Sequence, residues 1–153
     1  MARLLFVTHC PSVNTRHLRD SALAAIQSLN LEDLEVRSLA PPAAGPHDVA
    51  WCDRILIGTT ENFGYMAGLI KDFFERIYYP CLTSTPGLPA ALYIRAGEDG
   101  RGTRTSIGKI VTGLRWKYVC KPLIMRGKFD AAFDEQVAEV AMIMAAGLDA
   151  GIY

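Results

Sequence analysis

The feature that most constrains the fold lies in the first sixteen residues, where an apolar run stops at a short polar loop and a helix follows. Residues 4–7 (LLFV) have the composition and length of a strand buried on both faces of a sheet. After residues 8–15, apolar side chains recur three or four positions apart, which predicts a helix whose first free N–H groups point back at the loop. A loop between a buried strand and a helix N-terminus is suited to hold an anion such as a phosphate.

The alternation of strand and helix continues along the chain. Strands are predicted at residues 4–7, 34–39, 54–59, 89–95 and 120–125. Long helices are predicted after Asn14, at 67–78, after a cap at Thr103 or Thr105, and after a cap at Asp130. A short helical turn is expected at 48–52. Pro80 is expected to end the helix predicted at 67–78. Five alternations predict one α/β domain, residues 1–153, with a parallel sheet and helices on both faces.

Composition narrows the class of partner. Lys plus Arg and Asp plus Glu both number 16, so net charge gives no reason to expect nucleic acid or a membrane surface as partner. No apolar run approaches the roughly twenty residues that span a bilayer, and the N-terminal run lacks the pattern of a signal peptide. The four cysteines show no metal-ligand spacing, and three of them, Cys52, Cys81 and Cys120, are expected to be buried thiols. These observations favour a cytoplasmic location, a small-molecule partner and no metal.

Three polar loops should meet at one edge of the sheet. Residues 8–15, 60–66 and 96–102 each follow a predicted strand, and the carboxyl ends of parallel strands share one edge, where ligands bind. The chain lacks GxxxxGK[ST], which excludes a P-loop nucleotidase, and it lacks GxGxxG after its first strand, which argues against a common dinucleotide fold. No acidic pair ends the first strand, which counts against a receiver domain.

Two of these segments resemble a known family. The segment THCPSVNTR, Thr8 to Arg16, resembles the phosphate loop of flavodoxin-like flavoproteins. The segment GTTENFGYMAGLIKDFFER, Gly58 to Arg76, is similar to the second flavin loop and following helix of the NAD(P)H-dependent FMN reductase and quinone reductase branch. The resemblance implies a flavodoxin-like three-layer sandwich, a five-stranded parallel sheet of order 2-1-3-4-5, and noncovalently bound FMN.

The resemblance also assigns site residues, in three groups. It places the FMN phosphate in the first loop, the isoalloxazine ring against the second, and the opposite rim at the third. Val13 stands where the family has glycine, and Thr60 replaces its proline. The cofactor-binding residues are therefore expected to be His9, Ser12, Val13, Asn14, Thr15 and Arg16; Thr60, Glu61, Asn62, Phe63, Gly64 and Tyr65; and Gly97, Glu98, Asp99 and Gly102.

The function implied is transfer of electrons from NAD(P)H to a flavin, quinone or similar acceptor. No side chain is assigned as a catalytic acid or base, because the flavin itself accepts the hydride. The chain is short for a quinone reductase, so a second copy is expected to complete the pocket for nicotinamide or acceptor.

Two other functions remain open at this stage. One is a flavodoxin-type electron carrier that serves a redox partner protein and has no substrate of its own; the balanced charge argues against it, since such carriers are strongly acidic. The other is a low-molecular-weight cysteine phosphatase, because His9 and Cys10 followed by five residues and Arg16 match the HCx5R signature.

Overall fold

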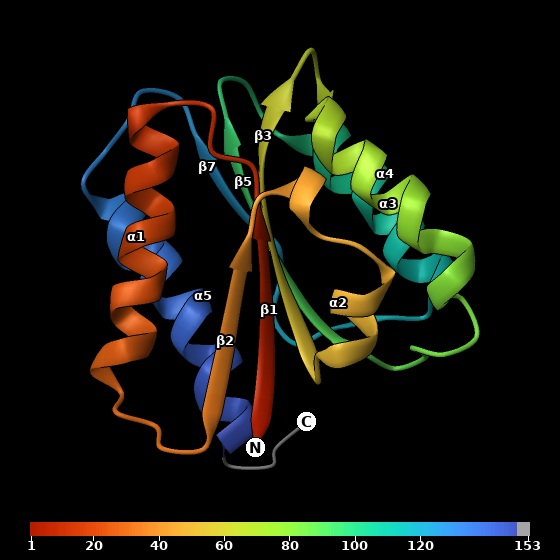
Figure 1. Ribbon diagram of the computed structural model, residues 1–153. Coiled ribbons are helices and arrows are strands. Elements are labelled where there is room, and N and C mark those ends of the chain that lie inside the picture. The colour runs from red at the N-terminus through yellow and green to blue at the C-terminus, as the bar shows by residue number, and fades with distance from the viewer. Residues whose placement is uncertain (150–153) are drawn as a thin grey trace.

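The structure is a computed structural model, and it describes residues 1–149. Figure 1 shows a central sheet between two layers of helices. The strands are β1 (Ala2–Thr8), β2 (Leu34–Leu39), β3 (Arg54–Asn62), β4 (Tyr65–Met66), β5 (Pro89–Ala96), β6 (Lys117–Tyr118) and β7 (Leu123–Arg126). The helices are α1 (Val13–Ser28), the 3₁₀ turn η1 (Pro41–Ala43), α2 (Pro46–Trp51), α3 (Gly68–Cys81), α4 (Arg101–Gly113) and α5 (Ala132–Asp149).

The strands follow the predicted 2-1-3-4-5 order, except that the fifth strand is split into two pieces. Across the sheet the order is β2-β1-β3-β5-β6, all parallel, and β7 also pairs in parallel with β5. Thus β6 and β7 are two pieces of the fifth strand. The prediction of one strand at 120–125 is wrong at its start, because Pro122 has no N–H to donate to β5 and residues 120–122 are not in a strand.

The two faces of the sheet have separate cores. Leu4 and Phe6 of β1 point to the face that α1 and α5 cover, where Leu18, Val137 and Met144 pack. Alternate residues of the same strand, Leu5 and Val7, point to the other face, where they lie in one core with α2, α3 and α4. Both sets are fully buried, which confirms that β1 is a central strand with apolar side chains on both sides.

The segment predicted as a loop at 60–66 is instead a β-hairpin. Strand β3 runs on to Asn62, and β4 returns antiparallel to it, with Glu61 opposite Met66 and Asn62 opposite Tyr65. Only Phe63 and Gly64 form the turn, and both have positive φ, as a two-residue type I′ turn requires. The prediction missed the hairpin because Phe-Gly is not one of the usual sequences for such a turn.

Two helix boundaries also differ from the prediction. Pro80 lies inside the last turn of α3, which continues to Cys81, so it does not end the helix. Neither Thr103 nor Thr105 caps α4, because the cap residue is Gly100. Its φ of 69° is free of strain for glycine but costs conformational free energy for a residue with a side chain. By contrast Asp130 does act as a cap, because its Oδ1 accepts a hydrogen bond from the Ala132 N–H at 2.8 Å.

Candidate functional site

The β1–α1 loop presents a capped helix start. Ser12 is the N-cap of α1: its Oγ accepts from the Thr15 N–H at 3.2 Å, and the Ser12 N–H donates to Thr15 Oγ1 at 2.9 Å. The N–H of Arg16 donates to the Ser12 carbonyl, so the first two helical residues, Val13 and Asn14, keep N–H groups that the cap does not use. The first turn holds no acidic side chain. Its positive end therefore faces solvent without a countercharge.

A buried hydrogen bond fixes the base of this loop. Thr8 Oγ1 lies 2.9 Å from the Tyr93 hydroxyl, which reaches across from β5, and 3.5 Å from Cys10 Sγ. The side chain of Tyr93 passes over Gly58 of β3, because a Cβ there would lie 2.3 Å from the tyrosine Cζ. The His9 N–H also donates to the Gly58 carbonyl at 2.9 Å. The loop is thus anchored to both β3 and β5 before it reaches α1.

The His9 side chain adds no charge to this loop at neutral pH. Partial burial lowers its pKa, because desolvation disfavours the imidazolium. Any anion held at the α1 N-terminus would therefore be bound by backbone N–H groups and hydroxyls, with Arg16 as the one nearby cation of the first turn. Arg16, Val13 and Asn14 are all exposed.

The turn of the β3–β4 hairpin exposes an aromatic ring in a strained conformation. The Phe63 side chain is fully exposed, and its φ of 53° lies in the left-handed region that residues with a Cβ disfavour. Tyr65 is exposed as well. The exposure of the aromatic rings and the positive φ of Phe63 both cost free energy in the protein without a ligand. An exposed ring held under strain at the carboxyl edge of a parallel sheet is the kind of outlier from which a function is inferred.

Glu61 joins the hairpin to the β5–α4 loop. Its Oε1 accepts from the Glu98 N–H at 2.9 Å and its Oε2 from the Gly100 N–H at 2.8 Å. Both carboxylate oxygens are therefore used inside the protein, and they compensate the positive end of α4. Thr60 Oγ1 in turn donates to Asn62 Oδ1 at 2.9 Å, which steadies the end of β3. The second and third predicted loops are thus joined by hydrogen bonds.

The hairpin and α4 also touch directly, at two glycines. A Cβ on Gly102 would lie 2.0 Å from the Gly64 carbonyl oxygen. No side chain fits between them, so Gly102 is required for the hairpin to rest on α4. Gly97, Glu98, Asp99 and Gly102 are all exposed, and Gly102 also contacts the hairpin.

Gly102→Ala should therefore displace the hairpin, while Gly108→Ala on the same helix should not. We expect the first change to lower the free energy of unfolding by about 1–3 kcal/mol through overpacking. The second meets open space and should raise it by about 0.5–1 kcal/mol, because alanine is the better helix former. Urea unfolding of both variants measures this; equal effects would show that the hairpin moves away from α4 at no cost.

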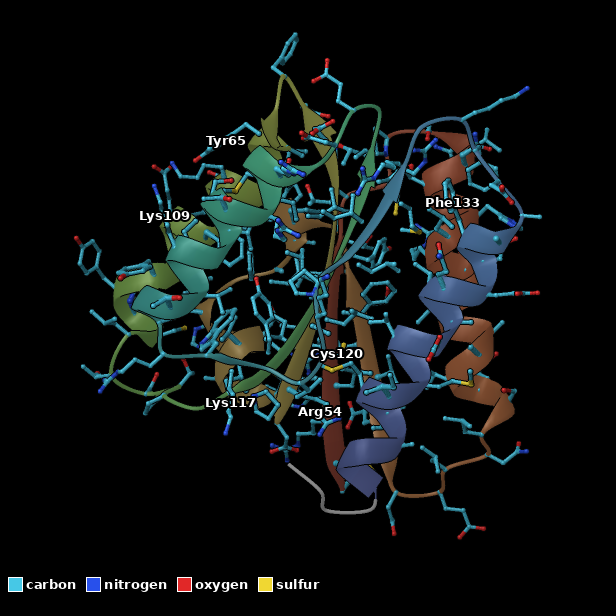
Figure 2. All side chains as sticks on the ribbon, turned by 180° about the vertical axis from the view of Figure 1, so that it is seen from behind. Arg54, Tyr65, Lys109, Lys117, Cys120 and Phe133 are labelled. Atoms are coloured by element: carbon cyan, nitrogen blue, oxygen red, sulfur yellow. The ribbon has the colours of Figure 1, made fainter. Side chains whose placement is uncertain are left out.

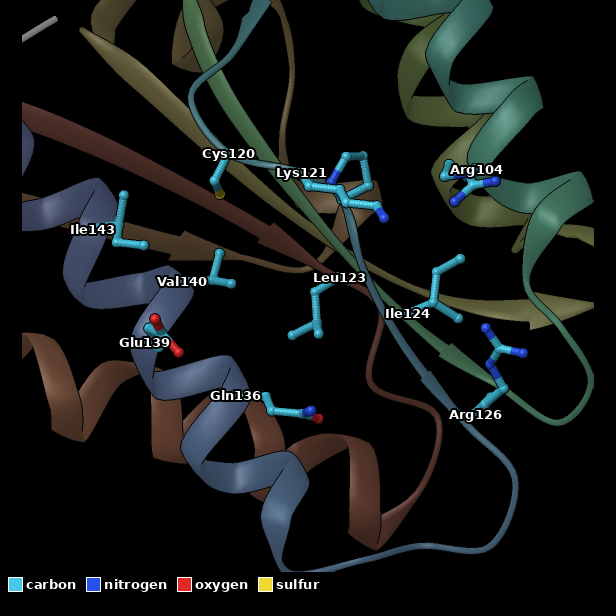
Figure 3. A pocket seen from close by; sticks show the side chains of 11 residues that line it. Arg104, Cys120, Lys121, Leu123, Ile124, Arg126, Gln136, Glu139, Val140 and Ile143 are labelled. Atoms are coloured by element: carbon cyan, nitrogen blue, oxygen red, sulfur yellow. The ribbon is translucent and has the colours of Figure 1, made fainter.

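One cavity lies beside this edge of the sheet, and another lies away from it. The first, of about 600 Å³, is lined by Thr8, His9 and Cys10. The rest of its lining was not predicted and comes from α1, the end of β2, the segment after β2, and α3: Arg19, Asp20, Leu23, Ser38, Leu39, Ala40, Pro41, Pro42 and Leu69. The other, of about 480 Å³, runs along β7 between α5 and Arg104 (Figure 3). It contains none of the predicted site residues.

Cys120 lines the β7 cavity, and it is only half-buried, so the expectation that it is a buried core thiol is wrong. The interruption of the fifth strand exposes it. Burial first, and the nearby Glu139 second, raise its pKa. The thiol is therefore protonated at neutral pH and unreactive.

The geometry of the β1–α1 loop does not favour the hypothesis of a cysteine phosphatase. A Cx5R loop must wrap its N–H groups around the cysteine sulfur, but here the chain is already helical from Val13 onward. The N–H groups of Thr15 and Arg16 are used by Ser12, and Arg16 is exposed on the helix. Cys10 contacts Thr8 instead.

Comparison with known proteins supports the fold. No known protein-family model matches the chain. The flavodoxin of Aquifex aeolicus (strain VF5) is 26% identical over 114 residues, which cover 74% of this chain and 60% of that protein. The chain therefore matches less than two thirds of that relative's length.

Solved structures give the same result at lower identity. A flavodoxin from the domain Archaea superposes with a TM-score of 0.80 at 14% identity, covering 95% of this chain and 98% of that one. An NADH:FMN oxidoreductase in its apo form gives 0.73 at 14% identity, covering 97% and 90%. The chain has the flavodoxin-like α/β fold, as the sequence resemblance implied. Both a flavodoxin and an NADH:FMN oxidoreductase share it.

No helix within residues 1–149 is long and apolar enough to cross a membrane.

Proposed function

We propose that this protein binds FMN noncovalently at the carboxyl edge of its sheet and oxidises NAD(P)H, passing the electrons to a flavin, quinone or similar acceptor. The observation that carries the proposal is the start of α1. Its free N–H groups at Val13 and Asn14, its exposed Ser12 hydroxyl, and the absence of an acidic residue in its first turn suit a phosphate dianion. Thr15 is buried and its hydroxyl donates to the Ser12 carbonyl, so in this proposal Thr15 shapes the loop.

The second part of the site suits a planar ring. Phe63 and Tyr65 stand exposed on a hairpin beside the phosphate-binding loop, and a bound isoalloxazine would cover surface that is costly to leave in water. Gly64 and Gly97 meet nothing where a Cβ would project, so backbone at both loops is open to close approach by a ligand. When bound, FMN supplies the hydride chemistry, and the chain supplies orientation and electrostatics.

The role of Glu61 in this proposal differs from direct flavin contact. Since both its oxygens bond to the β5–α4 loop, Glu61 holds this loop and the hairpin together. Gly102 does the same from α4 through its contact with Gly64. In this proposal the remaining predicted residues of the two loops, with Asn62 at the end of β3, contact the flavin ring.

The choice of enzyme over carrier rests on charge. A flavodoxin-type carrier is favoured by the Aquifex relative, whose name is flavodoxin. However, acidic carriers are steered to basic partners by their net charge, and this chain has 16 residues of each sign. An enzyme that takes small substrates needs no such steering.

Titration with FMN tests the proposal first. We expect the fluorescence of FMN to be quenched on binding, with a dissociation constant at or below the micromolar range. Anaerobic mixing of the loaded protein with NADPH or NADH should then bleach the flavin without any added protein. Bleaching only after a reductase protein is added would support the carrier, and failure to bind FMN would refute the proposal as a whole.

A further inference from the structure

A cavity of about 540 Å³ lies on the far side of the hairpin, between it and helices α3 and α4. Figure 2 labels two residues at its rim, Tyr65 on the hairpin and Lys109 on α4. The residues lining it are Gly64, Tyr65, Lys71, Arg101, Gly102, Thr105, Ser106, Lys109 and Ile110. Its volume lies in the usual range for a small-molecule site.

The lining of this cavity is cationic. It contains Lys71, Arg101 and Lys109 and no carboxylate. The ion pairs that two of them make are exposed and weak: Lys71 Nζ lies 3.4 Å from Glu75 Oε1, and Arg101 Nε lies 4.0 Å from Asp99 Oδ2. Within residues 1–149, Lys109 makes no ion pair. In a chain with balanced charge, this segregation favours an anionic ligand.

The spacing of the cations indicates two separate anionic groups. Arg101 and Lys109 are eight residues apart on one helix, or about 12 Å along its axis. Arg101 begins α4 next to the hairpin, because Gly102 rests on Gly64. Lys109 lies two turns farther away. A ligand with phosphates at two positions therefore matches this spacing better than a single phosphate does.

We infer that this cavity binds the adenosine side of NADPH and selects it over NADH. The inference rests on the proposed function, since it names the reductant for the same flavin. The pyrophosphate lies at Arg101 and Lys71, and the 2′-phosphate lies at Lys109. Tyr65 and Ile110 offer an aromatic ring and an apolar surface to the adenine. The nicotinamide end then extends past the hairpin toward its flavin-binding side.

The test compares 2′,5′-ADP with 5′-AMP, which lacks the 2′-phosphate, by isothermal titration of the full chain at low salt. Wild-type protein should bind 2′,5′-ADP about tenfold or more tightly than 5′-AMP, the effect of one charge-assisted contact. Lys109→Gln should lose this preference. Lys117→Gln is the matched control, because Lys117 is also exposed but begins β6 at the opposite end of the sheet (Figure 2), and it should keep the preference.

Titrating protein both with and without FMN separates this inference from the proposed function. If FMN binds and wild-type protein does not distinguish the two nucleotides, the NADPH site is refuted and the flavoprotein stands. If 2′,5′-ADP binds through Lys109 but FMN does not bind, the anion site stands and the flavin proposal fails. An unchanged preference in Lys109→Gln, or loss of preference in Lys117→Gln as well, also refutes the site.

Discussion

Gly58→Ala should lower the free energy of unfolding by about 3 kcal/mol, at the upper end of overpacking effects. A Cβ at this position would lie 2.3 Å from Tyr93 Cζ and 2.6 Å from Thr8 Oγ1. Neither neighbour can move away, since both are buried and hydrogen-bonded to each other in the centre of the sheet. The β1–α1 loop, which is anchored to Gly58 through the His9 N–H, should shift with them.

A double-mutant cycle with Tyr93→Leu checks the cause, because leucine does not reach over Gly58. In urea unfolding, the two changes together should cost less than the sum of their separate effects. Gly97→Ala, where a Cβ meets open space at the same edge of the sheet, should change stability by only about 0.5 kcal/mol. Additive effects in the cycle would show that contact with Tyr93 is not what excludes a side chain at residue 58.

The main strands could be predicted because their signal is local and strong, whereas their order in the sheet came from the family resemblance. Residues 4–7 and 55–57 are continuous apolar runs, and both are buried on both faces in the structure. Strand β2 has the predicted bounds, Leu34–Leu39, since its alternating side chains distinguish it from a helix. Helix α1 follows from its apolar period in the same way.

What could not be predicted depends on contacts between distant segments. The turn at Phe63 and Gly64 is stabilised by the pairing of β3 with β4 and by the contact of Gly64 with α4. No local sequence pattern encodes either interaction. Glu61 looks like any polar loop residue in the sequence, yet it bonds to N–H groups 37 and 39 positions away. The cavity at Lys71 and Lys109 needs two helices to be placed side by side.

Ser12→Asp should abolish tight binding of FMN while leaving the fold as stable as before. Aspartate is as good an N-cap as serine, and the first turn of α1 has no acidic residue, so the new carboxylate should gain from the helix dipole. A phosphate bound at the free N–H groups would lie within about 4–6 Å of it. At an effective dielectric constant of about 20, that repulsion is several kcal/mol before screening, and we expect about a hundredfold loss of affinity.

Riboflavin, which lacks the phosphate, provides the control for this prediction. Ser12→Asp and wild-type protein should bind riboflavin equally, because the isoalloxazine contacts at the hairpin are unchanged. Ser12→Thr, which keeps both the cap and the hydroxyl, should retain FMN binding within a few-fold. If Ser12→Asp bound FMN as tightly as wild-type protein, the phosphate could not lie at the start of α1. Equal losses for FMN and riboflavin would instead mean that the substitution had reshaped the loop.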